Sequence, residues 1–373
     1  MAGENYQNET EEPKVGGFKR KTIIRGVFWF VLITVITMAA IFIINNTGDT
    51  LGALKKIKGK FIFLCFGMLV VDLFLGALRN HIFVWQVNKQ VNFWASFKAN
   101  VANMFMGAVT PAHGGAAPAQ IYVYMSSGLK FVDAFSISLI NFGATLVFMP
   151  IAAFMAVILL KQEVPDGLIL NLLNYGFSFF FLFLIVFIFI FFKPLLAGKA
   201  IRKIAVYLAG KFPRYGTKLK NWGNKSYSNI QTYQQTCKLM LRKNPLLFPI
   251  AVLITFVLYL NKYVMQYVIL LGLGIQADLY QVIAYQVLIQ FMIYFAPSPG
   301  GSGFAEAGIA VLFAKIVNGS TLPLFTLLQR SFLLFFPAII GAFVMIGQLN
   351  KDIRKTRVIK GPANDLTLQD TKN

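Results

Sequence analysis

The stretch LILNLLNYGFSFFFLFLIVFIFIFF, residues 168–192, decides the fold class of this chain. It contains no charged side chain, and about 20 consecutive apolar residues in a helix are enough to cross the hydrocarbon core of a bilayer. Other long apolar runs lie at 27–44, 61–79, 134–160, 246–272 and 322–347. We therefore predict an all-α, polytopic integral membrane protein, a helical bundle built on these six spans.

The composition of the whole chain agrees with this class. Of its 373 residues, 57% are hydrophobic and only 13% are charged, which excludes an ordinary soluble protein. Lys and Arg number 35 against 14 Asp and Glu, a net charge of +21. In a soluble chain this excess would point to nucleic acid, whereas here we expect no DNA partner. Cys65 and Cys237 are too few for a disulfide framework or a Cys-rich metal site, so we expect neither a metal nor a cofactor.

Basic residues near the ends of the spans set the orientation of the chain. The loop 193–243 carries twelve of them and no acidic residue, so we expect it on the cytoplasmic side. There it is predicted to form a short amphipathic helix on anionic lipid headgroups, or alternatively a solvated basic linker. Basic residues also occur in the tails 1–26 and 349–373. We expect a multi-pass protein of the cell (plasma) membrane, with a membrane domain over 27–348 and both termini in the cytoplasm.

Two further apolar stretches, near 99–125 and 281–317, are broken by glycine and proline. With the loop 193–243 inside, the first stretch must begin and end on the cytoplasmic side and the second on the outer side. Each is therefore a re-entrant hairpin or a pair of spans. The order span, broken hairpin, span then occurs twice with opposite orientation, which is the inverted-repeat plan of many transporters.

Each broken stretch contains a motif of similar composition. Residues 110–120 read TPAHGGAAPAQ, and residues 298–306 read SPGGSGFAE. Dropping Ala112 and His113 aligns the paired glycines and places Gln120 opposite Glu306. Proline followed by glycines interrupts a helix, so we expect each motif to be a turn between two half-helices that lines a cavity. The alternative is that the glycines serve only close helix packing.

A half-helix that starts after such glycines can hold an anionic group, for example a lipid phosphate. Its free N–H groups and its dipole both favour negative charge. We expect both turns, together with two nearby charged residues, to bind the substrate. The predicted substrate-binding residues are Thr110, Pro111, His113, Gly114, Gly115, Gln120, Pro299, Gly300, Gly301, Gly303, Glu306 and Arg330.

Ionisable residues within apolar runs usually face a functional interior, because a charge at the bilayer centre is costly. Glu306 and Arg330 are expected to face the same cavity and to pair, with Arg330 offering a bidentate fork to a phosphate or a carboxylate. The alternative is a purely structural buried ion pair. Asp72 and Lys262, in the middle of two spans, are expected to meet in a similar way. His113 could gate a proton, or simply make an ordinary hydrogen bond in its turn.

The two motifs resemble those of the lysylphosphatidylglycerol synthase transmembrane family, which includes flippase-like proteins of bacteria and archaea. The resemblance covers about residues 20–350. It departs from the family where an acidic residue often follows the first Gly-Gly, since Ala116 and Ala117 stand here, and where Ala305 replaces an often basic residue. The residues that carry the resemblance are Thr110-Pro111, Gly114-Gly115, Pro118, Gln120, Tyr122, the run from Pro297 to Gly303, Glu306, Arg330, Pro337 and Gly341.

This resemblance implies a transporter or flippase for an anionic or aminoacylated phospholipid, or for a polyprenyl-type lipid. Two alternatives stay open: a phosphatidylglycerol lysyltransferase that uses lysyl-tRNA, and a membrane scaffold for a separate lipid-modifying enzyme. Full-length synthases add a cytoplasmic transferase domain, whereas only 22 residues follow Lys351 here, so we expect no catalysis by this chain alone. The sequence has no Walker-type loop, so transport would be downhill or coupled to an ion.

Overall fold

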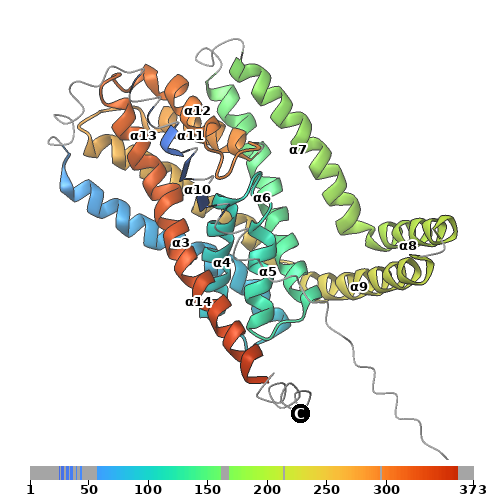
Figure 1. Ribbon diagram of the computed structural model, residues 1–373. Helices are drawn as coiled ribbons and strands as arrows, with labels where there is room; N and C mark the ends of the chain where they lie inside the picture. The colour runs from blue at the N-terminus through green and yellow to red at the C-terminus, as the bar shows by residue number, and fades with distance from the viewer. Residues whose placement is uncertain are drawn as a thin grey trace, which may run out of the picture.

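The structure of the chain is a computed structural model that describes residues 57–160, 168–212, 215–294 and 296–359, together with part of 25–43. Within these residues it consists of helices and connecting turns and contains no β-strand, which confirms the all-α prediction. The helices are α3 (Gly59–Val87), α4 (Phe93–Val109), α5 (Ala116–Ser126), α6 (Phe131–Leu159), α7 (Leu168–Phe192), α8 (Pro194–Lys211), α9 (Gly216–Lys243), α10 (Leu247–Gly272), α11 (Leu279–Ile293), α12 (Phe304–Leu312), η2 (Phe313–Lys315), α13 (Leu322–Arg330), η3 (Ser331–Phe335) and α14 (Phe336–Ile359) (Figure 1).

Four described helices are long and apolar enough to cross a membrane, namely α3, α6, α10 and the unit Leu322–Asp352 that joins α13 to α14. They lie where the sequence predicts spans. The stretch 168–192 forms α7, which meets α8 at a bend of 91°. Half of the predicted first span, 27–44, lies outside the described residues, and its described residues are helical. The chain is therefore an integral membrane protein.

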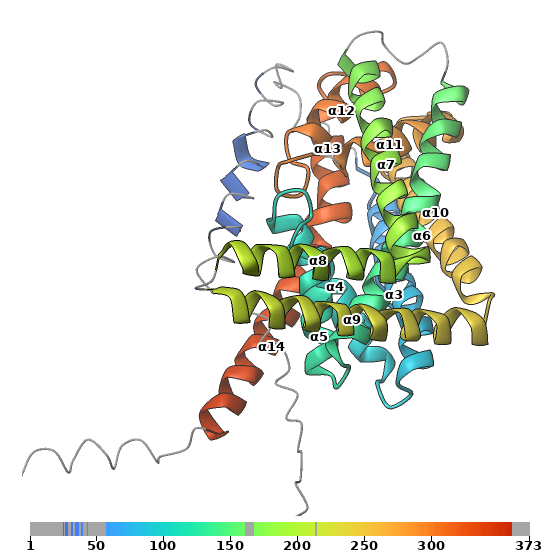
Figure 2. The ribbon, with the colours of Figure 1, turned by 90° about the vertical axis from the view of Figure 1, so that its right-hand side faces the viewer.

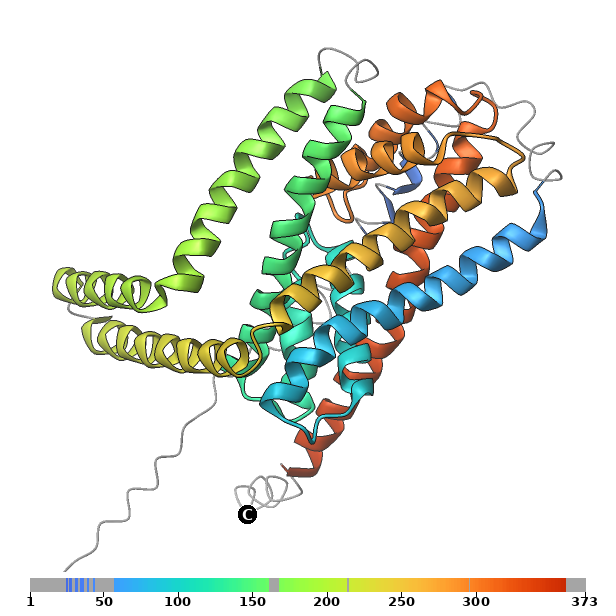
Figure 3. The ribbon, with the colours of Figure 1, turned by 180° about the vertical axis from the view of Figure 1, so that it is seen from behind.

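The centre of the bundle is built from pairs of helices that are distant in sequence. α3 and α10 run side by side across the molecule (Figure 3). α4 packs against α14, and α11 packs against α6. The contact between α4 and α14 is close, since a Cβ added at Gly341 would lie 2.0 Å from the carbonyl oxygen of Val101. Glycine is thus required at this crossing.

The two broken stretches form two helical hairpins. α4 and α5 lie in the lower half of Figure 1, whereas α11 and α12 lie in the upper half. The turns at their tips meet, because Pro111 and Pro299 pair through an isolated antiparallel β-bridge. The two motifs identified in the sequence are therefore in direct contact.

The basic loop 193–243 forms two helices, α8 and α9, that pack along each other as an antiparallel hairpin (Figure 2). Small residues allow this close packing, since a Cβ added at Gly223 would lie 2.6 Å from the Cβ of Ala205. The hairpin is tied to the bundle near the start of α6, where the hydroxyl of Thr236 donates to Asp133 at 3.0 Å. The sequence predicted one short helix here, and the structure has a longer helical hairpin.

Candidate functional site

The two turns follow the same backbone path. Ala112 and His113 have φ angles of 49° and 55°, and Gly300 and Gly301 have φ angles of 59° and 65°. The alignment that drops Ala112 and His113 is therefore wrong, because these two residues adopt the left-handed conformations of the second motif's paired glycines. The alignment paired the glycines of one motif with those of the other. In the structure, the residues with left-handed φ angles correspond instead, and in the first motif these are not glycines.

A hydrogen bond closes each turn in the same way. The N–H of Gly114 donates to the carbonyl oxygen of Pro111 at 3.0 Å. The N–H of Ser302 donates to the carbonyl oxygen of Pro299 at 3.1 Å. Each bond spans three residues from the proline, so the two turns match without a gap.

The half-helices that follow also begin at matching positions. Gly115 is the N-cap of α5, and Gly303 is the N-cap of α12. Because both lie four residues after the turn's proline, Gln120 and Glu306 are not counterparts as the sequence alignment proposed. The two side chains have different neighbours, which are described separately below.

Ala112 and His113 hold a strained conformation. A left-handed backbone costs roughly 1–2 kcal/mol for a residue with a Cβ, and such strain concentrates at functional sites. They are the non-glycine residues with positive φ among those the structure describes. Both line the cavity described below.

Side-chain hydrogen bonds support the first turn. The hydroxyl of Thr110 accepts the N–H of Gly115 at 2.8 Å and donates to the carbonyl oxygen of Met106. A Cβ added at Gly115 would lie 2.8 Å from the Cγ2 of Thr110, so no larger residue fits. One turn further into α5, the amide oxygen of Gln120 accepts the amide N–H of Asn103 at 3.0 Å. Thr110 and Gly115 thus shape the turn, and Gln120 links α5 to α4.

A buried ion pair braces the second turn. The Nε of Arg330 and the Oε1 of Glu306 lie 2.9 Å apart, which confirms the predicted pairing. The other oxygen of Glu306 accepts the N–H of Gly303 at 2.6 Å. Arg330 also donates through Nη2 to the carbonyl oxygen of Gly300 at 3.0 Å and to the hydroxyl of Ser302 at 3.1 Å. Arg330 ends α13 and is followed by the π-helical turn η3, a feature often found at functional sites.

A second ion pair joins the two central helices. The Nζ of Lys262 in α10 lies 3.0 Å from the Oδ2 of Asp72 in α3, as the sequence predicted. Asp72 is buried, and Lys262 reaches the surface of the cavity. The amide of Asn261 supports the same crossing, since it donates to the carbonyl oxygen of Met68 at 3.0 Å.

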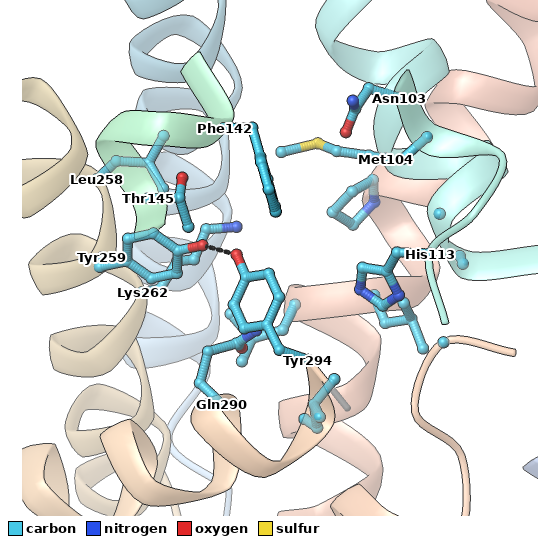
Figure 4. Close-up of a pocket in the computed structure, with 18 of the residues that line it drawn as sticks. Asn103, Met104, His113, Phe142, Thr145, Leu258, Tyr259, Lys262, Gln290 and Tyr294 are labelled. Carbon is cyan, nitrogen blue, oxygen red and sulfur yellow. Dashed lines mark hydrogen bonds between the residues drawn. The ribbon is translucent and has the colours of Figure 1, made fainter. Parts of the chain in front are cut away.

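A cavity of about 560 Å³ lies where these elements converge. It is lined by residues of α3, α4, α5, α6, α7, α10, α11 and α12, by both turns, and by residues near the junction of α13 and α14. Figure 4 shows Asn103 and His113 on one side of it and Lys262 on the other. The hydroxyls of Tyr259 and Tyr294 hydrogen bond to each other at its edge. The volume lies within the range typical of ligand sites.

The predicted substrate-binding residues divide between the wall of this cavity and the structure behind it. Those that line it are His113, Gly114, Gln120, Gly300 and Arg330. Those that lie outside its lining are Thr110, Pro111, Gly115, Pro299, Gly301, Gly303 and Glu306. The second group belongs to the turns and the structure behind them, whereas the first reaches the surface of the cavity.

Arg79 also lines the cavity, although it is not among the residues predicted from the sequence. This residue ends the apolar run 61–79, where a basic residue normally marks the edge of a span. However, α3 continues to Val87, so Arg79 lies inside the bundle. Its Nη1 donates to the hydroxyls of Thr145 and Thr255, both at 3.3 Å. The mostly apolar residues that follow Arg79 are the signal that could have revealed its interior position.

Neutral polar residues complete the wall. They come from α4, α6, α11 and α13, and single polar residues within apolar helices attract little notice in a sequence. The amide of Gln329 donates to the amide oxygen of Gln286 at 2.7 Å, which fixes both side chains. The additional polar lining residues are Asn100, Asn103, Ser138, Asn141, Thr145, Gln286, Gln290 and Gln329.

The cavity carries an excess of positive charge. Arg79, Lys262 and Arg330 line it, and the described residues of its lining include neither Asp nor Glu. Asp72 neutralises Lys262, and Glu306 neutralises Arg330. Within the part of the chain that the structure describes, Arg79 forms no ion pair. Guanidinium and ammonium groups such as these can form charge-assisted hydrogen bonds with an anionic group.

Comparison with known proteins supports the resemblance noted in the sequence. The family model described as "Lysylphosphatidylglycerol synthase TM region" matches residues 22–341. A relative described as "UPF0104 membrane protein", from Archaeoglobus fulgidus, is 22% identical over 346 residues, which cover 90% of this chain and 99% of the relative. No solved structure matches the chain.

Proposed function

This chain belongs to the family of lysylphosphatidylglycerol synthase transmembrane regions, and from this premise we propose that it moves a phosphate-bearing lipid between the leaflets of the membrane. The observation that carries the proposal is the cationic cavity at the meeting point of the two turns. A lipid headgroup needs a polar, charge-matched path through the bilayer, while its acyl chains remain in hydrocarbon. A lipid-related role also fits the family.

The proposal includes an inverted repeat whose two hairpins are re-entrant. Three observations support it: the gap-free match of the turns, the pairing of α3 with α10, and the way each hairpin packs against the last long helix of the other half. In this arrangement α4 and α5 enter from the cytoplasmic side, α11 and α12 enter from the outside, and both termini lie in the cytoplasm. The turns then meet near mid-membrane, where irregular backbone is tolerated because it lines a cavity.

In the proposed mechanism the lining residues replace the water that a headgroup leaves behind. Arg79 attracts the phosphate, because its charge has no ion-pair partner among the described residues. Gln290 and Asn103 offer amide groups to the remaining polar atoms of the headgroup. Arg330 and Lys262 add positive potential while their carboxylate partners hold them in place. The sequence has no nucleotide-binding loop, so movement follows the lipid gradient or an ion gradient.

Reconstituted vesicles test this function. A phosphatidylglycerol that carries a fluorophore on one acyl chain is placed in both leaflets, and a membrane-impermeant reductant bleaches the outer pool. Vesicles with the wild-type protein should lose the inner pool as well. Arg79→Gln should slow this loss at least ~10-fold, because a charge-assisted hydrogen bond contributes roughly 1.5–3 kcal/mol.

Lys89→Gln is the matched control, since it removes one positive charge from an exposed residue just beyond α3. It should transfer lipid at the wild-type rate. If Arg79→Gln and the wild type transferred lipid at the same rate, the cavity would not be the path of the headgroup. The same vesicles supplied with labelled lysyl-tRNA test the lysyltransferase alternative, because a transporter forms no lysyl-lipid. Co-purification of a lipid-modifying enzyme, with transfer insensitive to Arg79→Gln, would instead support the scaffold alternative.

A further inference from the structure

The charges around the cavity select among the lipids that the family resemblance leaves open. This inference rests on the proposed function and concerns the same site. An aminoacylated headgroup carries one or more ammonium groups, which need a carboxylate or several carbonyl oxygens as partners. A simple phosphodiester headgroup carries a negative charge, which needs donors. Accessible carboxylates in the lining would therefore favour an aminoacylated headgroup, whereas cations and free hydrogen-bond donors would favour a phosphodiester.

Two acids near the cavity each pair with a cation, although the Oδ1 of Asp72 is buried without a hydrogen-bond donor. Glu306 contacts Arg330 through one oxygen and the N–H of Gly303 through the other, and it lies outside the lining. Asp72 contacts Lys262 and also lies outside the lining. An ammonium group inside the cavity would therefore meet cations and no accessible carboxylate.

The donors, in contrast, are not all satisfied. Arg79 is anchored through Nη1 by two threonine hydroxyls, but its Nε is buried without a hydrogen-bond acceptor. The amide nitrogen of Gln120 is also buried without an acceptor. A buried donor without an acceptor is unfavourable, and a phosphate oxygen would satisfy it. The amide oxygens of Asn141 and Gln329 in the lining are also buried without a donor, so the preference for an anion rests on the positive charge of Arg79, which has no ion-pair partner among the described residues.

We propose that the cavity binds headgroups of net negative charge, phosphodiesters or phosphomonoesters without an amine, and excludes aminoacylated headgroups, with Arg79 as the principal ligand. Arg79 is well suited because its planar guanidinium can present two N–H groups to two phosphate oxygens, while Nη1 remains bonded to the threonines. Lys262 and Arg330 raise the positive potential without offering a carboxylate to an ammonium group.

Binding to the purified full chain tests this proposal without depending on transport. Native mass spectrometry compares phosphatidylglycerol, phosphatidylcholine and lysylphosphatidylglycerol in pairwise competition. The wild type should prefer phosphatidylglycerol over each of the others by at least ~10-fold, which corresponds to about 1.4 kcal/mol. Arg79→Gln should remove the preference, and Arg79→Lys should keep part of it because the charge remains. Circular dichroism of both variants confirms that they fold.

Equal binding of the three lipids by the wild type, or a preference for lysylphosphatidylglycerol, would overturn the proposal. A competition arm with inorganic phosphate separates the two sources of the anion. Displacement of phosphatidylglycerol by millimolar phosphate identifies the phosphate group alone as the ligand, and resistance to displacement identifies the intact lipid. Selective binding without vesicle transfer would refute transport and leave this specificity intact.

The α8–α9 hairpin carries a second, independent inference. α8 leaves α7 at 91°, so if α7 crosses the membrane the hairpin lies in the membrane plane. The segment 193–243 contains twelve basic residues and no acidic one. An apolar groove at its free tip is lined by Leu208, Phe212, Tyr215, Lys218, Leu219 and Trp222. Exposed aromatic rings beside lysines are typical of a membrane interface.

We infer that this tip inserts into the headgroup region of an anionic leaflet. The occupant is a lipid surface, because the charge of the hairpin is complementary to anionic lipids and its aromatic tip matches the boundary between headgroups and acyl chains. Phe212, Tyr215 and Trp222 are each more than half exposed, so they are free to insert. The basic residues along both helices would hold the hairpin flat.

Quenching of Trp222 by brominated lipids tests this inference in the reconstituted full chain, with Trp222→Phe giving the background of the other tryptophans. The Trp222 signal should be quenched by bromines near the start of the acyl chain, and more strongly in vesicles that contain phosphatidylglycerol than in pure phosphatidylcholine. Quenching by a water-soluble quencher alone, unchanged by lipid charge, would refute membrane insertion.

Discussion

Ala112→Gly should stabilise this protein and Gly300→Ala should destabilise it, although the two residues occupy equivalent positions in the two turns. Their φ angles are 49° and 59°, both in the left-handed region. There a Cβ costs roughly 1–2 kcal/mol, while its removal raises the entropy of the unfolded chain by about 0.4–1 kcal/mol. The difference predicts a gain of about 0.5–1 kcal/mol for Ala112→Gly and a similar loss for Gly300→Ala.

Two further glycine substitutions sharpen this prediction. Gly301→Ala should cost more than Gly300→Ala, because the added Cβ would lie 2.7 Å from the Cγ2 of Ile293. Gly67→Ala is the control: it lies within α3, nothing stands within 4 Å of its added Cβ, and the change should stabilise the helix by up to about 1 kcal/mol.

Reversible unfolding in mixed micelles, followed by far-ultraviolet circular dichroism, measures these free energies. All four variants undergo a change between glycine and alanine, so differences in hydrophobicity are small and conformation dominates. If Gly300→Ala proved as stabilising as Gly67→Ala, or if Ala112→Gly destabilised the protein by more than about 1 kcal/mol, the left-handed assignment of both turns would be refuted.

Three other predictions follow from the buried groups. Glu306→Gln and Arg330→Gln should each destabilise the protein by about 3–5 kcal/mol, because each leaves a buried charge unpaired. The double variant should lose less stability than the sum of the two single losses. Additive losses in the unfolding assay would contradict the pairing. Asp72→Asn should likewise destabilise the contact between α3 and α10, and combining it with Lys262→Met should recover part of the loss. Burial raises the pKa of the Cys237 thiol in α9 to about 11. Maleimide labelling of Cys237, read by peptide mass spectrometry, should therefore be slow at pH 7 and accelerate steadily towards pH 11, because only the thiolate reacts. Fast labelling at pH 7 would show that α9 does not pack as described.

Much of the fold could be predicted from the sequence, because bilayer thickness fixes the length of an apolar run. The stretches 61–79, 134–160 and 246–272 lie within or nearly coincide with α3, α6 and α10. The broken stretches were also recognisable, since proline and glycine interrupt a helix wherever they occur. The pairing of α4 with α14 was not predictable, because this contact depends on close approach at Gly341 and not on a local pattern.

The ion pairs of the site could be predicted, whereas its central cation could not. Buried charges need partners, so opposite charges in apolar runs must find each other, as Asp72 and Lys262 do. Arg79 has no such partner among the described residues, and its position at the end of an apolar run is also what a span boundary looks like. Only the continuation of α3 beyond it shows that it faces the interior.

One difference between the matching turns concerns His113 and Gly301. At Gly301 a Cβ would collide with Ile293, so the second turn requires glycine for its packing. At the equivalent position the first turn accepts the strain of His113, whose ring lines the cavity 6.2 Å from the ring of Tyr294. A glycine there would relieve the strain but would remove the imidazole from the cavity wall. Backbone strain of this kind concentrates at functional sites, so if the proposed function holds, we expect the first turn to contact the headgroup through His113, while Arg330 braces the second turn.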